Sequence, residues 1–154
     1  MDPRAATKTG LFLSPRSAAA VAATVLVLGT LLPAAAWTRD DVPPDVAARA
    51  NPVTLEDDEV RYYKRQFKGK CARCHGIDGT GKGDSAGDQT VPPANFTDSA
   101  YMSKRSDGQL YYQILEGGGE ACAMPAFGPG TDHSWTEDKI WHMVAYVRRF
   151  AATK

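Results

Sequence analysis

The pentapeptide Cys71-Ala72-Arg73-Cys74-His75 constrains what this chain can fold into more than any other stretch. Two cysteines three positions apart on one turn can each form a thioether with a vinyl group of the same macrocycle. A histidine directly after the second cysteine then lies under the iron. The pattern predicts one covalently attached haem c, held through Cys71 and Cys74, with His75 as the proximal ligand. The motif occurs once in the sequence, so a single haem is expected.

Two other interpretations of a Cys-x-x-Cys pair agree less well with the sequence. A thioredoxin-like redox pair would be surrounded by a βαβ pattern, which is absent, and it would leave His75 without a role. A zinc knuckle would need two further ligands at close spacing, whereas the one remaining cysteine, Cys122, stands alone.

Residues 1–36 have the layout of a secretory signal peptide. Three basic residues precede an apolar run over residues 18–32, and Ala34-Ala35-Ala36 offers a small-residue cleavage site. The alternative is an uncleaved anchor, because residues 17–37 are long enough to cross a bilayer with strain. Either way we expect the rest of the chain in the bacterial periplasm or on the outer face of the cytoplasmic membrane. Membrane contact is expected only if residues 17–37 remain uncleaved.

Residues 37–54 are predicted to form a Pro-containing extended arm ahead of a single domain over residues 55–154. The few apolar residues of this segment follow no clear period. It is either a free terminus or an arm that lies along a partner subunit.

The charge balance speaks against a nucleic-acid partner. The chain has 18 basic and 18 acidic residues, and no basic stripe is evident along it. The ring of lysines that some electron carriers use for docking is not evident either.

Three main helices are expected. The first spans residues 55–70, with Thr54 as its N-cap, acidic residues in its first turn and lysines at its end. The second opens on a capping box at Ser106 and stops at three glycines, residues 117–119. The third begins after Thr136 and runs to residue 151, with Ile140, Met143, Val144 and Val147 on its buried face.

Residues 76–84 are rich in glycine. No strand precedes them and no Gly-Lys-Ser/Thr follows, so a phosphate-binding loop is not expected. We expect a tight Ω-like loop along one haem edge, with glycines where φ is positive or where the backbone passes close to the ring.

The combination of these stretches resembles the class I c-type cytochromes over about residues 55–151. The matching residues are Cys71 to Gly76, Asp78 to Gly83, Pro92-Pro93, Asn95 to Asp98, Met124 to Phe127, and Tyr146. The resemblance implies an all-α cytochrome c fold, with three main helices and loops around one covalently attached haem, His and Met as axial ligands, and electron transfer as the activity. It also implies that Pro92 or Pro93 presents a carbonyl to Nδ1 of His75. One departure is Tyr63, because many members have glycine eight residues before the first cysteine.

Met124 is the expected distal ligand, since it sits in a loop beside a proline after a glycine-terminated helix. Met102 is assigned to a polar turn and Met143 to the core of the last helix. His133 and His142 are the competing ligands, of which His142 is expected to be a partly exposed helix residue. Cys122 has three interpretations: a small buried hydrophobe, an intermolecular contact or disulfide, and a thiolate ligand.

The expected function is one-electron transfer outside the cytoplasm, without catalysis, because six-coordinate iron leaves no position for a substrate. Redox proteins are the expected partners. The chain is either a subunit or dedicated donor/acceptor of a larger, membrane-bound redox complex, which the arm and near-neutral charge favour, or a freely diffusing periplasmic carrier. A haem enzyme or gas-binding sensor with a labile distal ligand is the alternative from another class.

Overall fold

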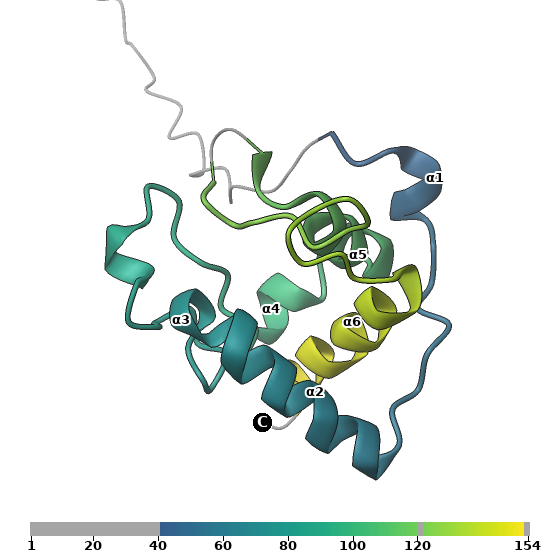
Figure 1. The fold of residues 1–154 in the computed structure, drawn as a ribbon, viewed down its shortest axis with the longest axis horizontal. Coiled ribbons are helices and arrows are strands. Elements are labelled where there is room, and N and C mark those ends of the chain that lie inside the picture. Colours follow the sequence, from purple (N-terminus) through teal and green to yellow (C-terminus); the bar gives the residue numbers. More distant parts are fainter. Residues whose placement is uncertain (1–40, 120–121, 153–154) are drawn as a thin grey trace, which may run out of the picture. The chain divides into compact units, whose positions relative to one another are not determined.

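The computed structural model describes residues 41–119 and 122–152, and no β-strand occurs among them. Three main helices, α2 (Asp57–Lys70), α5 (Asp107–Glu116) and α6 (Glu137–Ala152), confirm the predicted all-α architecture (Figure 1). Loops and shorter helical segments join them: α1 (Pro44–Ala47), α3 (Ala72–His75), η1 (Ala86–Asp88) and α4 (Ser99–Met102).

The predicted leader, residues 1–36, lies outside the described residues, as do residues 37–40 of the predicted arm. Within the described part of the chain, no helix combines the length and the apolar character that a bilayer span requires.

Helix α2 begins two residues later than predicted. Glu56, rather than Thr54, is its N-cap, and Glu56 and Glu59 form a reciprocal capping box. The Glu59 carboxylate accepts a hydrogen bond from the backbone N–H of Glu56 at 2.9 Å. Two acidic side chains near the positive end of the helix dipole satisfy the free N–H groups there, so the helix starts where this pair forms.

The ends of α5 and α6 follow the sequence signals. Ser106 Oγ accepts from the Gln109 N–H at 3.1 Å and the Gln109 side chain bonds back to the Ser106 N–H, which confirms the predicted capping box. Gly117 ends α5 with a φ of +72°. Thr136 Oγ1 accepts from the Lys139 N–H at 3.2 Å, as expected of the N-cap of α6.

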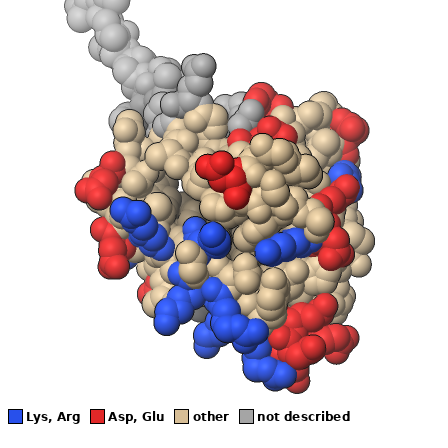
Figure 2. Space-filling model, viewed as in Figure 1, with Lys and Arg blue, Asp and Glu red and all other residues tan. Residues whose placement is uncertain are grey.

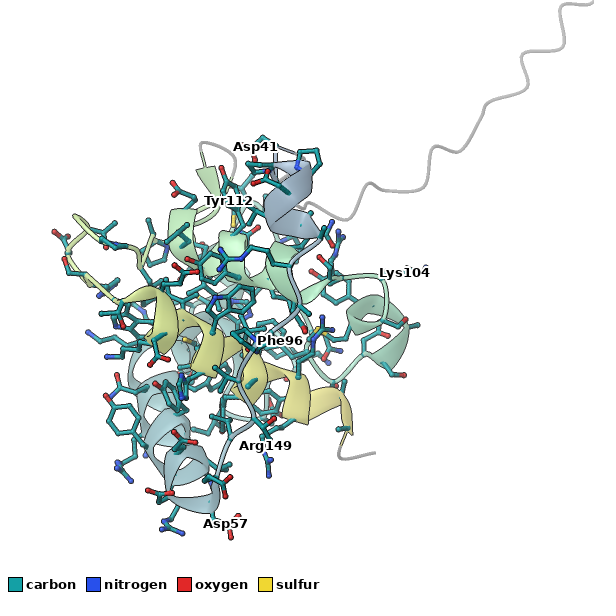
Figure 3. All side chains as sticks on the ribbon, turned by 90° about the vertical axis from the view of Figure 1, so that its right-hand side faces the viewer. Asp41, Asp57, Phe96, Lys104, Tyr112 and Arg149 are labelled. Atoms are coloured by element: carbon teal, nitrogen blue, oxygen red, sulfur yellow. The ribbon has the colours of Figure 1, made fainter. Side chains whose placement is uncertain are left out.

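The core lies where α6 packs against α2, α4 and α5. The predicted stripe of Ile140, Met143, Val144 and Val147 is buried in it. Figure 3 shows Phe96 among the crowded side chains of the interior, whereas Asp57 lies at the outer end of α2. The core also contains Met102, which is 2 % exposed, so its assignment to a polar turn is wrong. The cause is its position at the end of the single turn of α4, too short to show a periodic pattern.

Where α2 packs against α6, Tyr63 occupies the position at which many class I cytochromes have glycine, and it forms an aromatic pair with His142. The ring of Tyr63 stacks on that of His142, with centroids 5.2 Å apart and planes 19° apart. His142 Nε2 lies 3.2 Å from Glu59 Oε1 and its Nδ1 lies 2.7 Å from the Asp138 carbonyl. The His142 side chain is 14 % exposed, so it is tied into the contact between the helices.

The described part of the arm is packed on the domain, which corrects the expectation of an extended segment. Its α1 contacts α5, and the chain then runs beside α5 and α6 to the start of α2 (Figure 1). The Ala47 carbonyl accepts from Ser106 Oγ at 2.6 Å, and Asn51 Nδ2 donates to the Trp141 carbonyl at 2.9 Å. Sequence reasoning missed this because these bonds join residues far apart in the chain.

Arg49 holds the middle of the arm against the helices. Its guanidinium lies 5.0 Å from the centre of the Trp141 ring and 5.2 Å from that of Tyr111, and it pairs with the Glu137 carboxylate. The hydrogen bond from Arg49 lowers the pKa of Glu137. Stacking on two stacked aromatic rings suits the planar guanidinium and adds cation–π attraction to the ion pair.

Candidate haem site

The Cys71–His75 motif forms a single helical turn directly after α2. Cys71 ends α2, its N–H bonding to the Phe67 carbonyl at 2.8 Å, and its own carbonyl accepts from the His75 N–H at 2.9 Å as α3 begins. One turn therefore presents the two thiols and the imidazole together. All three residues line one hollow, here called the central pocket.

The central pocket encloses about 1100 Å³, counting its open mouth. Most of its wall is apolar and comes from all three main helices and from the loops between them. Representative wall residues are Phe67, Val91, Leu110, Ile114, Phe127 and Val147. An apolar, roomy hollow carrying two thiols, an imidazole and a thioether suits a covalently attached haem, whose macrocycle needs apolar walls and whose iron needs soft and imidazole ligands.

His75 is held in one orientation by its neighbours. Its Nδ1 lies 3.2 Å from the Ala94 carbonyl, and because a carbonyl can only accept, Nδ1 carries the proton and Nε2 is left with a free lone pair. The ring also stacks on Phe96, with centroids 4.6 Å apart. Burial lowers the pKa of His75, against the opposing effect of the hydrogen bond to Ala94. The neutral imidazole is the form that can bind a metal.

The acceptor for Nδ1 was expected at Pro92 or Pro93, and the structure places it one residue later, at Ala94. Both prolines line the central pocket. The Pro93 carbonyl instead faces Gly81, where a Cβ atom would lie 2.5 Å from that oxygen. The glycine loop, with φ of +76° at Gly81, therefore occupies the space beside Pro93, and Ala94 is the residue whose carbonyl reaches His75.

Burial keeps the thiol of Cys71 neutral when it has no bonded partner. Burial, and after it the neighbouring Cys74, raises the pKa of Cys71 to about 12. Neither thiol is in a disulfide. Among the described residues, no three His, Cys, Asp or Glu side chains gather into a metal-binding group.

Met124 lines the same pocket and is held by the end of α5. Its carbonyl accepts from the Gly118 N–H at 2.9 Å. Its sulfur lies 3.8 Å from Nε2 of Gln113, which also donates to the Gly117 carbonyl at 2.9 Å. The loop that carries Met124 is thus fixed to a main helix at both backbone and side chain.

The other candidate ligands are placed differently. His133 stacks on Phe127, with ring centroids 4.3 Å apart, and does not line the pocket; His142 lies between α2 and α6. Met143 lines the pocket from α6 while being 1 % exposed. Cys122 is half-buried in the pocket wall and packs against Gly118. The sulfur and imidazole groups that meet in the pocket are therefore those of Cys71, Cys74, His75, Cys122, Met124 and Met143.

The outer surface of α2 carries a short basic face. Arg61, Lys64, Arg65 and Lys68 recur at i, i+3, i+4 and i+7, all four are exposed, and none has an ion-pair partner in the part of the chain that the structure describes. Figure 2 shows Lys and Arg side chains gathered along this helix, with Asp and Glu at its start. No basic stripe was expected, so this face corrects that expectation. It is not evident in the linear sequence because acidic residues precede it closely in the chain.

A model of the family "cytochrome c oxidase, cbb3-type, subunit III" matches residues 58–147, more than half of the chain. The chain belongs to this family. The matched residues run from α2 into α6 and include the Cys71–His75 motif, so this is a cytochrome c domain of the cbb3 subunit III family. Membership implies covalent haem c and haem-based electron transfer, and it agrees with the resemblance to class I cytochromes.

Among solved structures, a chain of the reducing HAO-like protein complex of Kuenenia stuttgartiensis is similar in fold. The TM-score is 0.51 at 24% identity, and the match covers 64% of this chain and 46% of that one. This chain thus spans less than half the length of that structure. No curated protein matches the chain.

Two contributors to the site carry no motif in the sequence. Ala94 acts through its main-chain oxygen, which every residue type has, so its identity gave no signal. Gln113 sits on α5 eleven residues before Met124, and only the turn at Gly117 brings the two together. The one signal for Gln113 is its position four residues before Gly117, because a side chain in the last turn of a helix can contact the residues just beyond the helix C-terminus.

Proposed function

We propose that this cytochrome c domain is a one-electron carrier outside the cytoplasm, with haem c attached through Cys71 and Cys74 and with His75 and Met124 as axial ligands. The single observation that carries the proposal is the central pocket, in which two thiols, an imidazole with Nε2 free and a thioether line one apolar hollow. When bound, the haem supplies the one-electron couple.

In this function the chain's own residues hold the proximal histidine in place and shield the haem site from water. Ala94 and Phe96 fix the plane and tautomer of His75, so little reorganisation accompanies a change of charge. The apolar wall, with Phe67, Phe127 and Val147, excludes water and keeps the local dielectric low. Thioether ligation raises the potential relative to a second imidazole, so a potential on the positive side is expected.

The test is optical, on the full chain produced with haem c maturation. We expect haem that stays with the denatured protein, a low-spin ferrous spectrum and, in the ferric protein, the long-wavelength methionine-to-iron charge-transfer band. Rapid binding of carbon monoxide to the reduced protein, without that band in the oxidised protein, would overturn the relay function in favour of a haem enzyme or gas sensor.

The basic face of α2 supports a redox partner with an acidic surface, since complementary charge steers encounter between electron-transfer proteins. Membership of the cbb3 subunit III family favours a subunit or dedicated donor/acceptor of a larger redox complex over a freely diffusing carrier. Size-exclusion chromatography of native membrane extract separates the two: haem absorbance in a large species supports the subunit, and elution of all of it as a small protein overturns it.

A further inference from the structure

The side-chain amide of Gln113 reaches two atoms beyond the end of its own helix. Its Nε2 lies 2.9 Å from the Gly117 carbonyl and 3.8 Å from Sδ of Met124. An amide nitrogen has two hydrogens, so it can serve both acceptors, and a thioether sulfur is a weak but real acceptor at such distances. Gln113 is half-buried and lines the central pocket together with Met124.

We propose that Gln113 is a positioning residue for Met124: its amide occupies one sulfur lone pair and leaves the other directed to the iron site. This inference rests on the proposed function, because it presumes Met124 as the distal ligand. A thioether sulfur has two lone pairs, and either can become the metal ligand by inversion at sulfur. A donor fixed on one of them selects a single arrangement and withdraws electron density from the sulfur.

The backbone around Gln113 is rigid enough for this role. Gly117 has a φ of +72°, and a Cβ there would meet the Met124 carbonyl at 2.6 Å and the Ala126 nitrogen at 2.7 Å. The Met124 carbonyl in turn accepts from the Gly118 N–H at 2.9 Å. The helix end and the methionine loop therefore form one packed unit, which holds the backbones of Gln113 and Met124 at a fixed separation.

The chain offers a matched control in Gln89. This second glutamine also lines the central pocket, but its Nε2 donates to the Ser85 carbonyl at 2.9 Å and not to a sulfur. Gln89→Leu makes the same chemical change in the same pocket wall as Gln113→Leu. The difference between the two variants isolates the contact with Met124 from the general effect of an apolar substitution.

The experiment compares the full-length haem protein with Gln113→Leu and Gln89→Leu. We expect Gln113→Leu to have a lower reduction potential than Gln89→Leu, because a sulfur without the hydrogen bond donates more strongly and stabilises the ferric state. We also expect imidazole to displace the methionine of the ferric Gln113→Leu protein with about tenfold lower affinity than in the control, because it must break a stronger sulfur–iron bond. The paramagnetically shifted methyl resonances of the ferric protein should change pattern or broaden in Gln113→Leu alone, because the sulfur is free to invert.

A purely structural role for Gln113, through the Gly117 carbonyl, makes a different prediction. Gln113→Leu would then lower the free energy of unfolding while the potential, imidazole affinity and methyl pattern stay equal to those of Gln89→Leu, and that result would overturn the inference. Gln113→Glu provides a second variant if the leucine protein fails to fold. Its ionised carboxylate has no donor for the sulfur, so the same spectroscopic changes are expected there. A wild-type protein without the methionine charge-transfer band would instead refute the proposed function itself.

Discussion

The backbone of Gly108, in the first turn of α5, lies directly against the carbonyl of Val46 in the arm. A Cβ at position 108 would stand 1.8 Å from that oxygen, so only glycine allows the two segments to meet. Gly108→Ala should therefore push α1 away and lower the free energy of unfolding by about 1–3 kcal/mol, despite the better helix propensity of alanine.

Gly69→Ala is the matched control for that substitution. A Cβ at Gly69, near the end of α2, would meet no atom within 4 Å. The same substitution there should raise the free energy of unfolding by up to about 1 kcal/mol. Urea unfolding of both full-length variants gives the comparison, and equal responses at the two positions would show that the arm does not dock as described.

Tyr63 should make the domain sensitive to alkaline pH. Burial raises the pKa of its hydroxyl to about 12 from an ordinary value of 10.0, so folding favours the neutral phenol. The stability this provides is complete below pH 10 and is lost as the pH rises towards 12. Between these pH values, the free energy of unfolding measured with urea should fall less steeply with rising pH for Tyr63→Phe than for Tyr62→Phe. The second variant is the control, because it removes a more exposed hydroxyl from the same helix. Equal slopes of the free energy of unfolding against pH in the two variants would contradict the prediction.

Replacement of Met124 by histidine should lower the reduction potential, because a second imidazole stabilises the ferric state more than a thioether does. Met143→Leu is the control, since Met143 also lines the central pocket but is a buried core residue of α6. This variant should keep the potential and the charge-transfer band, at a loss of less than about 1.5 kcal/mol in stability. Loss of the band in Met143→Leu, with its retention in Met124→His, would assign the distal ligand to Met143 instead.

The basic face of α2 should govern reactions with anions. Arg61→Glu combined with Lys64→Glu reverses two exposed charges, and oxidation of the reduced protein by ferricyanide should slow by about tenfold at low salt. At 1 M salt, where the screening length is about 3 Å, the difference should disappear. Lys104→Glu with Lys139→Glu makes an equal change in net charge at two residues outside α2. An equal slowing in that pair would show that net charge, rather than this face, controls the rate.

Local signals in the sequence predicted much of the fold. The capping box at Ser106, the cap at Thr136 and the periodic stripe of α6 act within one or two helical turns, so they can be read along the chain. The start of α2 was placed two residues early, because Thr54 and Glu56 are both plausible caps and only the pairing with Glu59 decides between them.

What the sequence could not supply depends on contacts between distant segments. The arm packs because Arg49 finds Trp141 and Glu137, and the acceptor for His75 is settled by how Gly81 crowds the segment beside Pro93. The contact between Gln113 and Met124 likewise depends on the turn at Gly117, which brings the two residues together. The basic face of α2, in contrast, follows the helical period, so its charges are predictable from the sequence.

The hydrogen bond from His75 to Ala94 ends on a main-chain oxygen, and this makes the proximal side unusually tolerant of side-chain change. Any residue at position 94 brings the same acceptor, so replacing Ala94 removes nothing that the imidazole needs. The hydrogen bond is instead sensitive to substitution of Gly81, which does not contact the imidazole. A side chain at Gly81 would clash with the carbonyls of Pro93 and Ala94 and displace the acceptor. A mutational scan of this domain would therefore find the proximal ligand's weakest support in the glycine loop.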